Sequence, residues 1–480
     1  MRYYRWGIWK FAGICVVMLM VWCSAAVAAT EPQSQSQPVV QPPVEEAVPE
    51  QRPPEKPPEY LPSYYYPAIV PYAPYTTTFL PAPTTGLLAP YGYGAAEDTL
   101  AKGWQTHLLG PVLVTPYFEY DPIYRTNVFQ SYNDKKADLV NAIDPGVKFQ
   151  LPIEGGQHNL SLGYLGNGFF YSRYSDLSHY DSNVNGDAAL NWDKLSLKFG
   201  SAFRAATEEP TSTSGAPFLG QERFYYRTTP YFSAIYKVAD LWRVEANYQY
   251  DNLYFPSQDN QIDNYVYNTA GATLFYKFWP KTAALLQYVA VFRSHPFDSV
   301  DNNTVQSPMA GLTWEPTAKL SGTVKFGYTF GTYWQSLEGR NNSPGAFAMS
   351  IQTLYKYSAY TQVSLLAQRG IAEDVDYANN PYITTGLFLT LSHFWIASQV
   401  TSYVGCAYFN NDYLNTTQDA FTGTFLTRND NYESFSFGLS RPLTKYLRLR
   451  LDYEYDNRGS NLSFAAYNEH KVLLGLQASF

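Results

Sequence analysis

Long stretches of the chain alternate between apolar and polar residues, and this period of two constrains the fold more than any other feature. Residues 241–251 (LWRVEANYQYD) place Trp, Val, Ala and Tyr on one face and Arg, Glu, Asn, Gln and Asp on the other. Residues 319–330 and 447–456 repeat the pattern. Such segments are typical of two-faced β-strands. They occur in soluble sheets that pack one face on a core, and also in membrane barrels.

Three features favour the membrane barrel. The strands run about ten residues, the length that a tilted strand needs to cross a bilayer. Aromatic residues make up 17% of the chain, and Tyr and Trp lie near the ends of the apolar faces, as in interfacial girdles. Eight short turns, of which the seventh is predicted at 393–396, alternate with nine longer polar stretches, such as 411–430. The sequence therefore predicts an all-β, antiparallel, up-and-down transmembrane β-barrel of about 18 strands over residues 111–480, with 16 strands as the alternative.

The last ten residues, KVLLGLQASF (471–480), alternate like the other strands and end on Phe480. A barrel must pair its last strand with its first, because an open sheet edge in lipid leaves backbone groups without hydrogen bonds. A final strand that ends on an aromatic residue suits this closure. It also resembles the terminal signature of bacterial outer-membrane barrels, which implies that Phe480 helps the barrel assembly machinery to recognise the strand.

The N-terminal part of the chain differs in composition from the predicted barrel. A basic start, an apolar run and small residues up to Ala28 predict a cleaved signal peptide over residues 1–28, with an uncleaved anchor helix as the alternative. Residues 29–92 are rich in Pro, Glu and Gln, and are expected to form a largely disordered periplasmic spacer or tether. Residues 93–110 are expected to form a connector to the barrel.

Charge, cysteine content and motifs exclude several classes of function. The formal net charge of −8 argues against a nucleic-acid partner. Once the signal peptide is removed only Cys406 remains, so there is no intrachain disulfide or cysteine metal cluster. The six histidines are scattered, and HExxH, GxSxG and GxxxxGK motifs are absent. The Asp/Asn groups at 259–260 and 301–303 do not match an EF-hand and are expected to be solvated loops. We therefore predict no enzymatic activity, cofactor or metal site.

Both ends of the predicted barrel resemble a known family. Residues 112–152 contain a strand, a TNVF element, a short Lys/Asp-rich stretch and a second strand with PGV. This segment, and residues 440–480 at the other end, resemble the putative β-barrel porin 2 family of bacterial outer-membrane barrels. The resemblance covers roughly residues 110–480 and implies a barrel of a group often associated with exopolysaccharide production and export. The Pro-rich segment lies outside it.

The polar faces of the strands are predicted to line the lumen. The candidate lumen-facing residues are Arg243, Glu245, Lys325, Arg448, Arg450, Asp452 and Glu454. In the simpler interpretation, these charges pair across strands and solvate the barrel wall. In the functional interpretation, they form a water-filled path of mixed charge that selects a polar solute.

These features predict an outer-membrane pore that passes polar solutes or exopolysaccharide through its lumen. The alternatives are a general diffusion porin without a dedicated partner, and a plugged structural or adhesive barrel that acts through its long loops. The expected partners are outer-membrane lipid and lipopolysaccharide, the barrel assembly machinery and, if the cargo is a polysaccharide, polysaccharide export components.

Overall fold

The computed structural model describes residues 107–208, 223–317, 319–336, 340–373, 381–418, 423–462 and 465–479. The predicted signal peptide, the Pro-rich segment, most of the connector and Phe480 lie outside these residues. Within the described ranges, no helix is both long enough and apolar enough to cross a membrane. This part of the chain is mostly β-sheet, with four short 3₁₀ helices.

Nineteen strands follow one another along the described residues. They are β1 (His107–Leu109), β2 (Val112–Arg125), β3 (Asp138–Ile153), β4 (His158–Tyr171), β5 (His179–Asn191), β6 (Leu195–Glu208), β7 (Arg223–Ala239), β8 (Trp242–Tyr254), β9 (Tyr265–Trp279), β10 (Thr282–Ser294), β11 (Asn303–Thr317), β12 (Leu320–Tyr333), β13 (Gly345–Lys356), β14 (Thr361–Glu373), β15 (Pro381–Trp395), β16 (Val400–Gln418), β17 (Phe425–Pro442), β18 (Leu447–Ser460) and β19 (Tyr467–Ser479). The 3₁₀ helices are η1 (Glu154–Gly156), η2 (Ser175–Leu177), η3 (Gln258–Asp263) and η4 (Ser299–Asp301).

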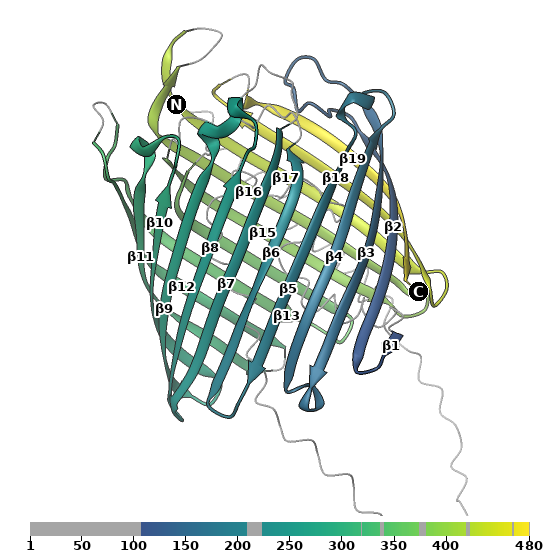
Figure 1. Ribbon diagram of the computed structural model, residues 1–480, viewed down its shortest axis with the longest axis vertical. Coiled ribbons are helices and arrows are strands. Elements are labelled where there is room, and N and C mark those ends of the chain that lie inside the picture. The colour runs from purple at the N-terminus through teal and green to yellow at the C-terminus, as the bar shows by residue number, and fades with distance from the viewer. Residues whose placement is uncertain are drawn as a thin grey trace, which may run out of the picture. The chain divides into compact units, whose positions relative to one another are not determined.

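The strands from β2 to β19 form a closed antiparallel barrel (Figure 1). Each pairs with the next along the chain, and β19 pairs with β2, where Lys471 lies opposite Arg125. The short β1 also pairs with β2. Because β3 pairs with one edge of β2, both β1 and β19 pair with the other edge. On that edge β1 contacts the first residues of β2 and β19 contacts the later ones. The predicted fold class and the count of 18 barrel strands are confirmed, and 16 strands are excluded. The sequence pattern does not predict β1.

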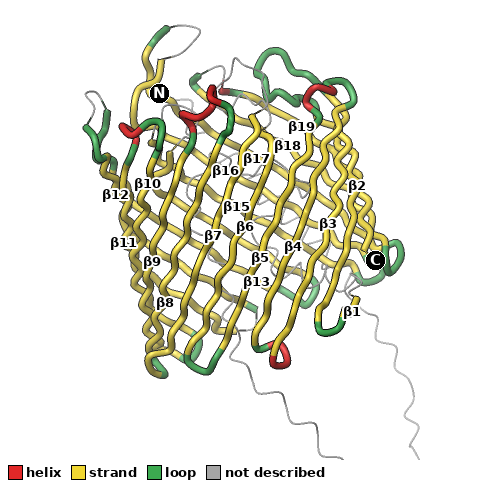
Figure 2. Tube along the Cα trace, in the orientation of Figure 1, coloured by secondary structure: helices red, strands yellow, loops and turns green. Residues whose placement is uncertain are grey.

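Short turns and long loops lie at opposite ends of the barrel, here called the short-turn end and the long-loop end (Figure 2). Each predicted short connection has a counterpart in the structure, although the seventh lies at 396–399 rather than 393–396. The predicted loop 411–430 is wrong over most of its length, because β16 continues to Gln418 and β17 begins at Phe425. Beyond a bilayer both faces of a strand meet water, so the alternation that identifies a strand disappears.

The two faces of the wall differ in chemistry, because alternate side chains of a strand point to opposite sides. On β2, Phe118, Tyr120 and Tyr124 are exposed on the outer face. Glu119 and Asp121, which lie between them on the inner face, are buried. The same alternation of exposed apolar and less exposed polar residues is seen on β8, β12 and β18. The barrel is therefore apolar outside and polar along much of its inner wall.

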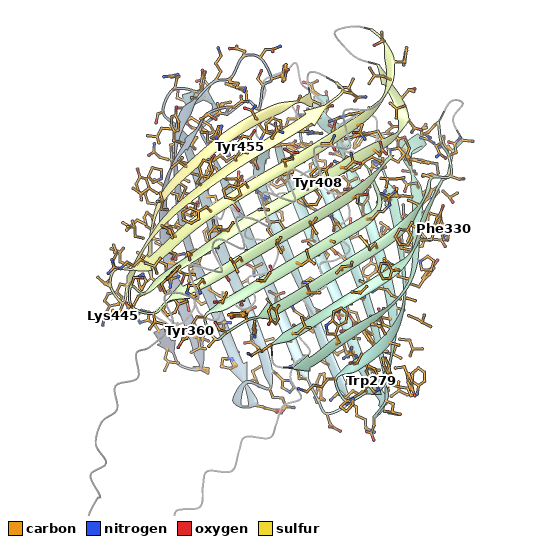
Figure 3. All side chains as sticks on the ribbon, turned by 180° about the vertical axis from the view of Figure 1, so that it is seen from behind. Trp279, Phe330, Tyr360, Tyr408, Lys445 and Tyr455 are labelled. Atoms are coloured by element: carbon orange, nitrogen blue, oxygen red, sulfur yellow. The ribbon has the colours of Figure 1, made fainter. Side chains whose placement is uncertain are left out.

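Aromatic side chains gather near both ends of the outer face. In Figure 3, Trp279 and Tyr360 lie near the short-turn end, and Phe330, Tyr408 and Tyr455 lie nearer the long loops. Outer tyrosine hydroxyls donate hydrogen bonds to amide oxygens on the next strand, in the pairs Tyr120–Asn141 (2.9 Å), Tyr248–Asn268 (2.7 Å), Tyr288–Gln306 (2.6 Å) and Tyr408–Asn431 (2.8 Å). Rings with an apolar body and a hydrogen-bonding tip suit the boundary between lipid and water.

Candidate functional site

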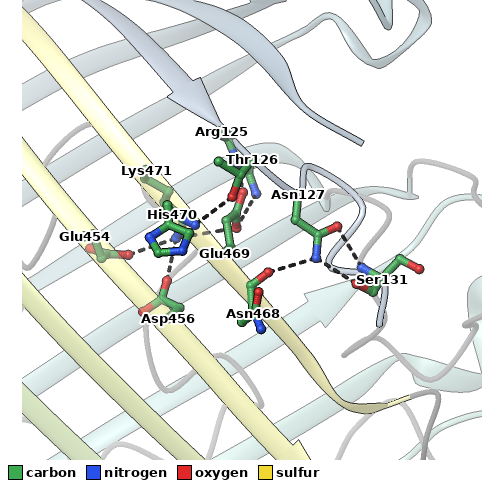
Figure 4. Close-up of polar contacts among 10 residues, drawn as sticks. All are labelled: Arg125, Thr126, Asn127, Ser131, Glu454, Asp456, Asn468, Glu469, His470 and Lys471. Carbon is green, nitrogen blue, oxygen red and sulfur yellow. Dashed lines mark hydrogen bonds and ion pairs between the residues drawn. The ribbon is translucent and has the colours of Figure 1, made fainter. Parts of the chain in front are cut away.

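Charged side chains of the inner face are concentrated at the seam where β18, β19 and β2 close the barrel (Figure 4). Lys471 Nζ on β19 donates to Glu454 Oε1 and to Asp456 Oδ2 on β18, each at 2.8 Å. Arg125 on β2 binds Glu469 on β19, with 2.8 Å between Nε and Oε1 and 3.2 Å between Nη2 and Oε2. None of these side chains is more than 4% exposed. A buried ion network therefore joins the first and last strands of the barrel.

A second charged group on the same wall lies closer to the short-turn end. Arg450 Nη2 is 2.8 Å from Asp452 Oδ2 on its own strand, and Arg450 also pairs across the seam with Glu119 on β2. The Tyr403 hydroxyl donates to Asp452 Oδ1 at 2.7 Å. Arg448 lies on the same face of β18, two residues nearer the turn. The four candidates on β18 thus share one face, on which Arg450, Asp452 and Glu454 take part in ion pairs.

The other three candidates come together on the opposite wall, on β8 and β12. Lys325 Nζ donates to Gln287 Oε1 at 3.1 Å, and the Arg243 guanidinium lies 4.0 Å from the centre of the Phe275 ring. Glu245 is buried and interacts electrostatically with both Arg243 and Lys325. β10, between these strands, is nine strands from β19 in either direction around the barrel. The predicted residues therefore form two charged groups that face each other across the lumen.

Further ion pairs on the inner face were not among the sequence candidates. They are Arg204–Asp181 (3.3 Å), Arg227–Asp251 (2.7 Å), Arg223–Glu208 (2.5 Å), Arg223–Asp263 (2.5 Å), Arg428–Asp430 (2.9 Å) and Arg458–Asp430 (2.6 Å). Asp263 belongs to η3, and all the others lie toward the long-loop ends of their strands. The alternation that identified the seven candidates also places Asp251 and Arg458 on the polar face, so the signal was present. Their partners depend on cross-strand register, which the alternation leaves open.

Two long loops place apolar side chains against the inner wall at the long-loop end. Val128, from the loop after β2, and Leu177 of η2 belong to one buried cluster with Ile123, Phe169 and Leu473. These two side chains are only 1% and 8% exposed. The loops therefore pack into the mouth of the barrel on this side of the wall.

A third loop, between β10 and β11, is also folded against the barrel. Asp301 of η4 pairs with Arg340 at 2.8 Å and is buried, which corrects the expectation that this Asp/Asn group is solvated. The backbone N–H of His295 donates to Asn302 Oδ1 at 2.6 Å, and the fully buried imidazole meets the Tyr267 ring edge-on. Burial and, secondarily, the nearby Arg293 lower the pKa of His295 from 6.5 to about 4.

The described residues contain no group of three or more His, Cys, Asp and Glu side chains that could hold a metal ion. In those same ranges many inner-face charges are bound to one another, to amides or to aromatic rings, as at Lys471, Lys325 and Arg243. What this arrangement can do is solvate and select a passing polar molecule.

A family model described as "Putative beta-barrel porin 2" matches residues 107–480. No curated protein matches the chain. The matched residues include all 18 strands of the barrel.

The solved structures to which the chain is similar include three of low sequence identity. The protein OpdK of Pseudomonas aeruginosa is 13% identical with a TM-score of 0.41, over 76% of this chain and 99% of that chain. OccK2 (OpdF) of Pseudomonas aeruginosa is 11% identical with a TM-score of 0.43, over 76% and 98%. OccAB3 of Acinetobacter baumannii is 9% identical with a TM-score of 0.40, over 77% and 99%.

Proposed function

Because the chain belongs to the putative beta-barrel porin 2 family, we propose that it is an outer-membrane pore through whose lumen polar solutes or an exopolysaccharide pass. The observation that carries this proposal is the polar chemistry of the inner wall. Buried and half-buried charges line it on two opposite sides, while the outer face carries exposed aromatic and aliphatic residues. Barrels of this strand number leave room for an aqueous channel.

Mixed charges on the wall support passage of polar rather than apolar molecules. Arg450, Asp452 and Glu119 on one side face Arg243, Glu245 and Lys325 on the other. Water and hydroxyl-rich solutes can exchange hydrogen bonds with such a surface, and rings of charge set selectivity in channels. Passage needs no chemical reaction, so we propose that the protein is not an enzyme.

A specific observation also favours a barrel that is narrowed or closed at its mouth. Val128 and Leu177 bring apolar loop surface into contact with the inner wall at the long-loop end. A plugged structural or adhesive barrel would use such packing to seal the lumen. A general diffusion porin would use the same loops only to set its size limit.

The remaining proposals concern the ends of the chain and its surroundings. We propose that residues 1–28 are removed as a signal peptide, that residues 29–92 lie in the periplasm, and that Phe480 is recognised by the barrel assembly machinery. The aromatic outer face suits contact with outer-membrane lipid and lipopolysaccharide. If the cargo is a polysaccharide, export components on the periplasmic side would deliver it.

The test is single-channel recording of the purified, folded protein in planar bilayers. A pore gives discrete conductance steps in KCl, and liposomes that contain the protein swell in neutral sugars up to a definite size. Folded protein that gives no conductance would refute the pore and leave the plugged barrel. Deletion of the gene, scored for secreted polysaccharide and for uptake of small polar solutes, separates an export channel from a general diffusion porin.

A further inference from the structure

We infer that the short-turn half of the lumen collects anions, so that the favoured cargo is a carboxylate-bearing solute that enters from the periplasm. This inference rests on the proposed function as a pore. Outer-membrane barrels place their short turns in the periplasm and their long loops outside the cell. The short-turn end of this barrel is therefore its periplasmic mouth.

Lysines on the inner face are confined to the short-turn half of the wall, apart from Lys471. Each of them occupies an inner-facing position in the half of its strand that adjoins a short turn. They are Lys148, Lys198, Lys237, Lys277, Lys325 and Lys356. They come from six different strands between β3 and β13, so their charges extend around more than half of the wall rather than form a single patch.

These lysines lack the close carboxylate contacts that Lys471 and the paired arginines make, and Lys325 interacts with Glu245 only beyond ion-pair distance. Lys325 Nζ binds an amide oxygen of Gln287, and Lys237 Nζ binds the carbonyl oxygen of Asp193, both at 3.1 Å. Lys198 Nζ lies 5.7 Å from the centre of the Tyr231 ring. Within the described ranges none of the six makes an ion pair, so their charge is not cancelled at close range.

The long-loop half of the same wall is different. Arg227 is paired with Asp251, Arg458 is paired with Asp430, and Lys471 is held by two carboxylates. A cation in that half therefore presents little free charge to a passing molecule. The difference between the halves follows from where the acidic residues lie along the strands.

Few carboxylates oppose the lysines at the short-turn end. The inner-face acids whose side chains are described near that end are Asp187, Glu119, Glu245 and Asp452, and Glu119 is paired with Arg450. Asp452 is bound to Arg450, and Glu245 already interacts with both Arg243 and Lys325. The wall therefore carries an excess of positive charge at the periplasmic mouth. Basic rings of this kind select anions in pores, and a charged cleft raises the local concentration of the opposite ion.

The carboxylate is the group that this mouth would recognise, whether it belongs to a small sugar acid or to an acidic glycan chain. A polymer with regularly spaced carboxylates would contact several lysines at once, and each new contact would be intramolecular, which strengthens binding. A neutral sugar gains nothing from the lysines and serves as the reference solute.

The experiment measures reversal potentials in a KCl gradient for the folded protein in planar bilayers. Wild-type protein is expected to prefer chloride over potassium. The ratio of chloride to potassium permeability should be at least about twofold lower in the variant K148Q/K198Q than in the wild type, because the variant removes two of the uncancelled charges. The matched control K135Q/K136Q removes two lysines from the loop between β2 and β3, at the long-loop end and away from the six lysines, and should leave the preference unchanged.

Added oligogalacturonate gives a second readout. It should reduce the current at a lower concentration from the periplasmic side than from the other, and K148Q/K198Q should abolish the difference. Glucuronate that acts as well as the oligomer would assign the site to small acids, whereas a stronger oligomer would assign it to acidic glycans. A conducting wild type that prefers potassium, or a double variant that behaves like wild type, overturns the inference and leaves the pore intact. No conductance from folded wild type overturns the proposed function and the inference with it.

Discussion

Replacing Lys471 by Met tests whether the seam network holds the barrel closed. Lys471 Nζ lies 2.8 Å from Glu454 and from Asp456, and 3.9 Å from Glu469. Its removal leaves these buried carboxylates without their common cation. Loss of one partner from a buried ion pair typically destabilises a protein by about 3–5 kcal/mol. We expect a decrease of this size in the free energy of unfolding of Lys471→Met.

The assay is urea unfolding of the barrel in phospholipid vesicles, followed by tryptophan fluorescence. A rescue variant, Lys471→Met/Glu454→Gln/Asp456→Asn, replaces the charges by neutral groups of similar shape. Since neutral replacement of a whole buried ion group is often tolerated, it should recover most of the lost stability. Lys148→Met is the matched control: this inner-face lysine makes no ion pair within the described residues, and its loss should change stability by less than about 0.5 kcal/mol.

Two results would contradict the reasoning. A decrease below about 1 kcal/mol for Lys471→Met would mean that water reaches the three carboxylates and screens them, as it does at exposed ion pairs. A rescue variant as unstable as the single variant would mean that the lysine acts through packing of its aliphatic stem rather than through its charge.

Two further predictions concern packing and pH. A Cβ at Gly327 would overlap the Pro308 carbonyl oxygen, so Gly327→Ala should lower the free energy of unfolding by about 1–3 kcal/mol in the same urea assay. The control is Gly459→Ala, which should be nearly neutral because its Cβ would lie 3.9 Å from its nearest neighbour. The lowered pKa of His295 means that the unfolded chain binds a proton before the folded chain does, so stability should fall as pH drops from 6.5 toward 4, by up to about 3 kcal/mol. His295→Phe should remove that part of the pH dependence, and equal pH slopes in both proteins would refute the assignment.

The sequence predicts which face of a strand a residue occupies but not which residue it meets. Arg243 and Glu245 could be placed on the polar face because a strand has a strict period of two. The pairing of Arg450 with Glu119 could not, since the two lie 331 residues apart and meet only when the barrel closes. The alternation is the same for every closure that keeps polar residues inside, so it contains no information about partners across the seam.

The same limit explains the parts of the structure that the pattern missed. The loop residues Val128 and Leu177 are apolar, but no periodicity marks a loop that folds back onto the wall. The long-loop ends of β16 and β17 carry polar residues on both faces, so these segments were predicted as loop. The sequence predicted Asp301 to be solvated because its partner, Arg340, lies in a different loop and no local pattern links the two.

The closing pair of strands needs a mechanism for choosing its register, because no hairpin turn joins β19 to β2. A slip of one residue would turn every apolar side chain inward, but a slip of two keeps both faces in place. Side chains on the inner wall distinguish the observed register from a slip of two residues. Gly475 lies beside Asp121, and a Cβ at this position would overlap the Asp121 carboxylate.

A slip of two residues in one direction would bring Leu473 to the buried carboxylate of Asp121 and would place Lys471 beside Ile123. A slip in the other direction would bring the longer Gln477 to Asp121 and would move Lys471 beyond Arg125. Either slip separates Arg125 from Glu469 and Arg450 from Glu119, while Lys471 keeps its partners on β18. Loss of such buried ion pairs costs several kcal/mol. The apolar belt of the barrel therefore decides which face is inside, and the buried charges together with Gly475 decide where the first and last strands meet.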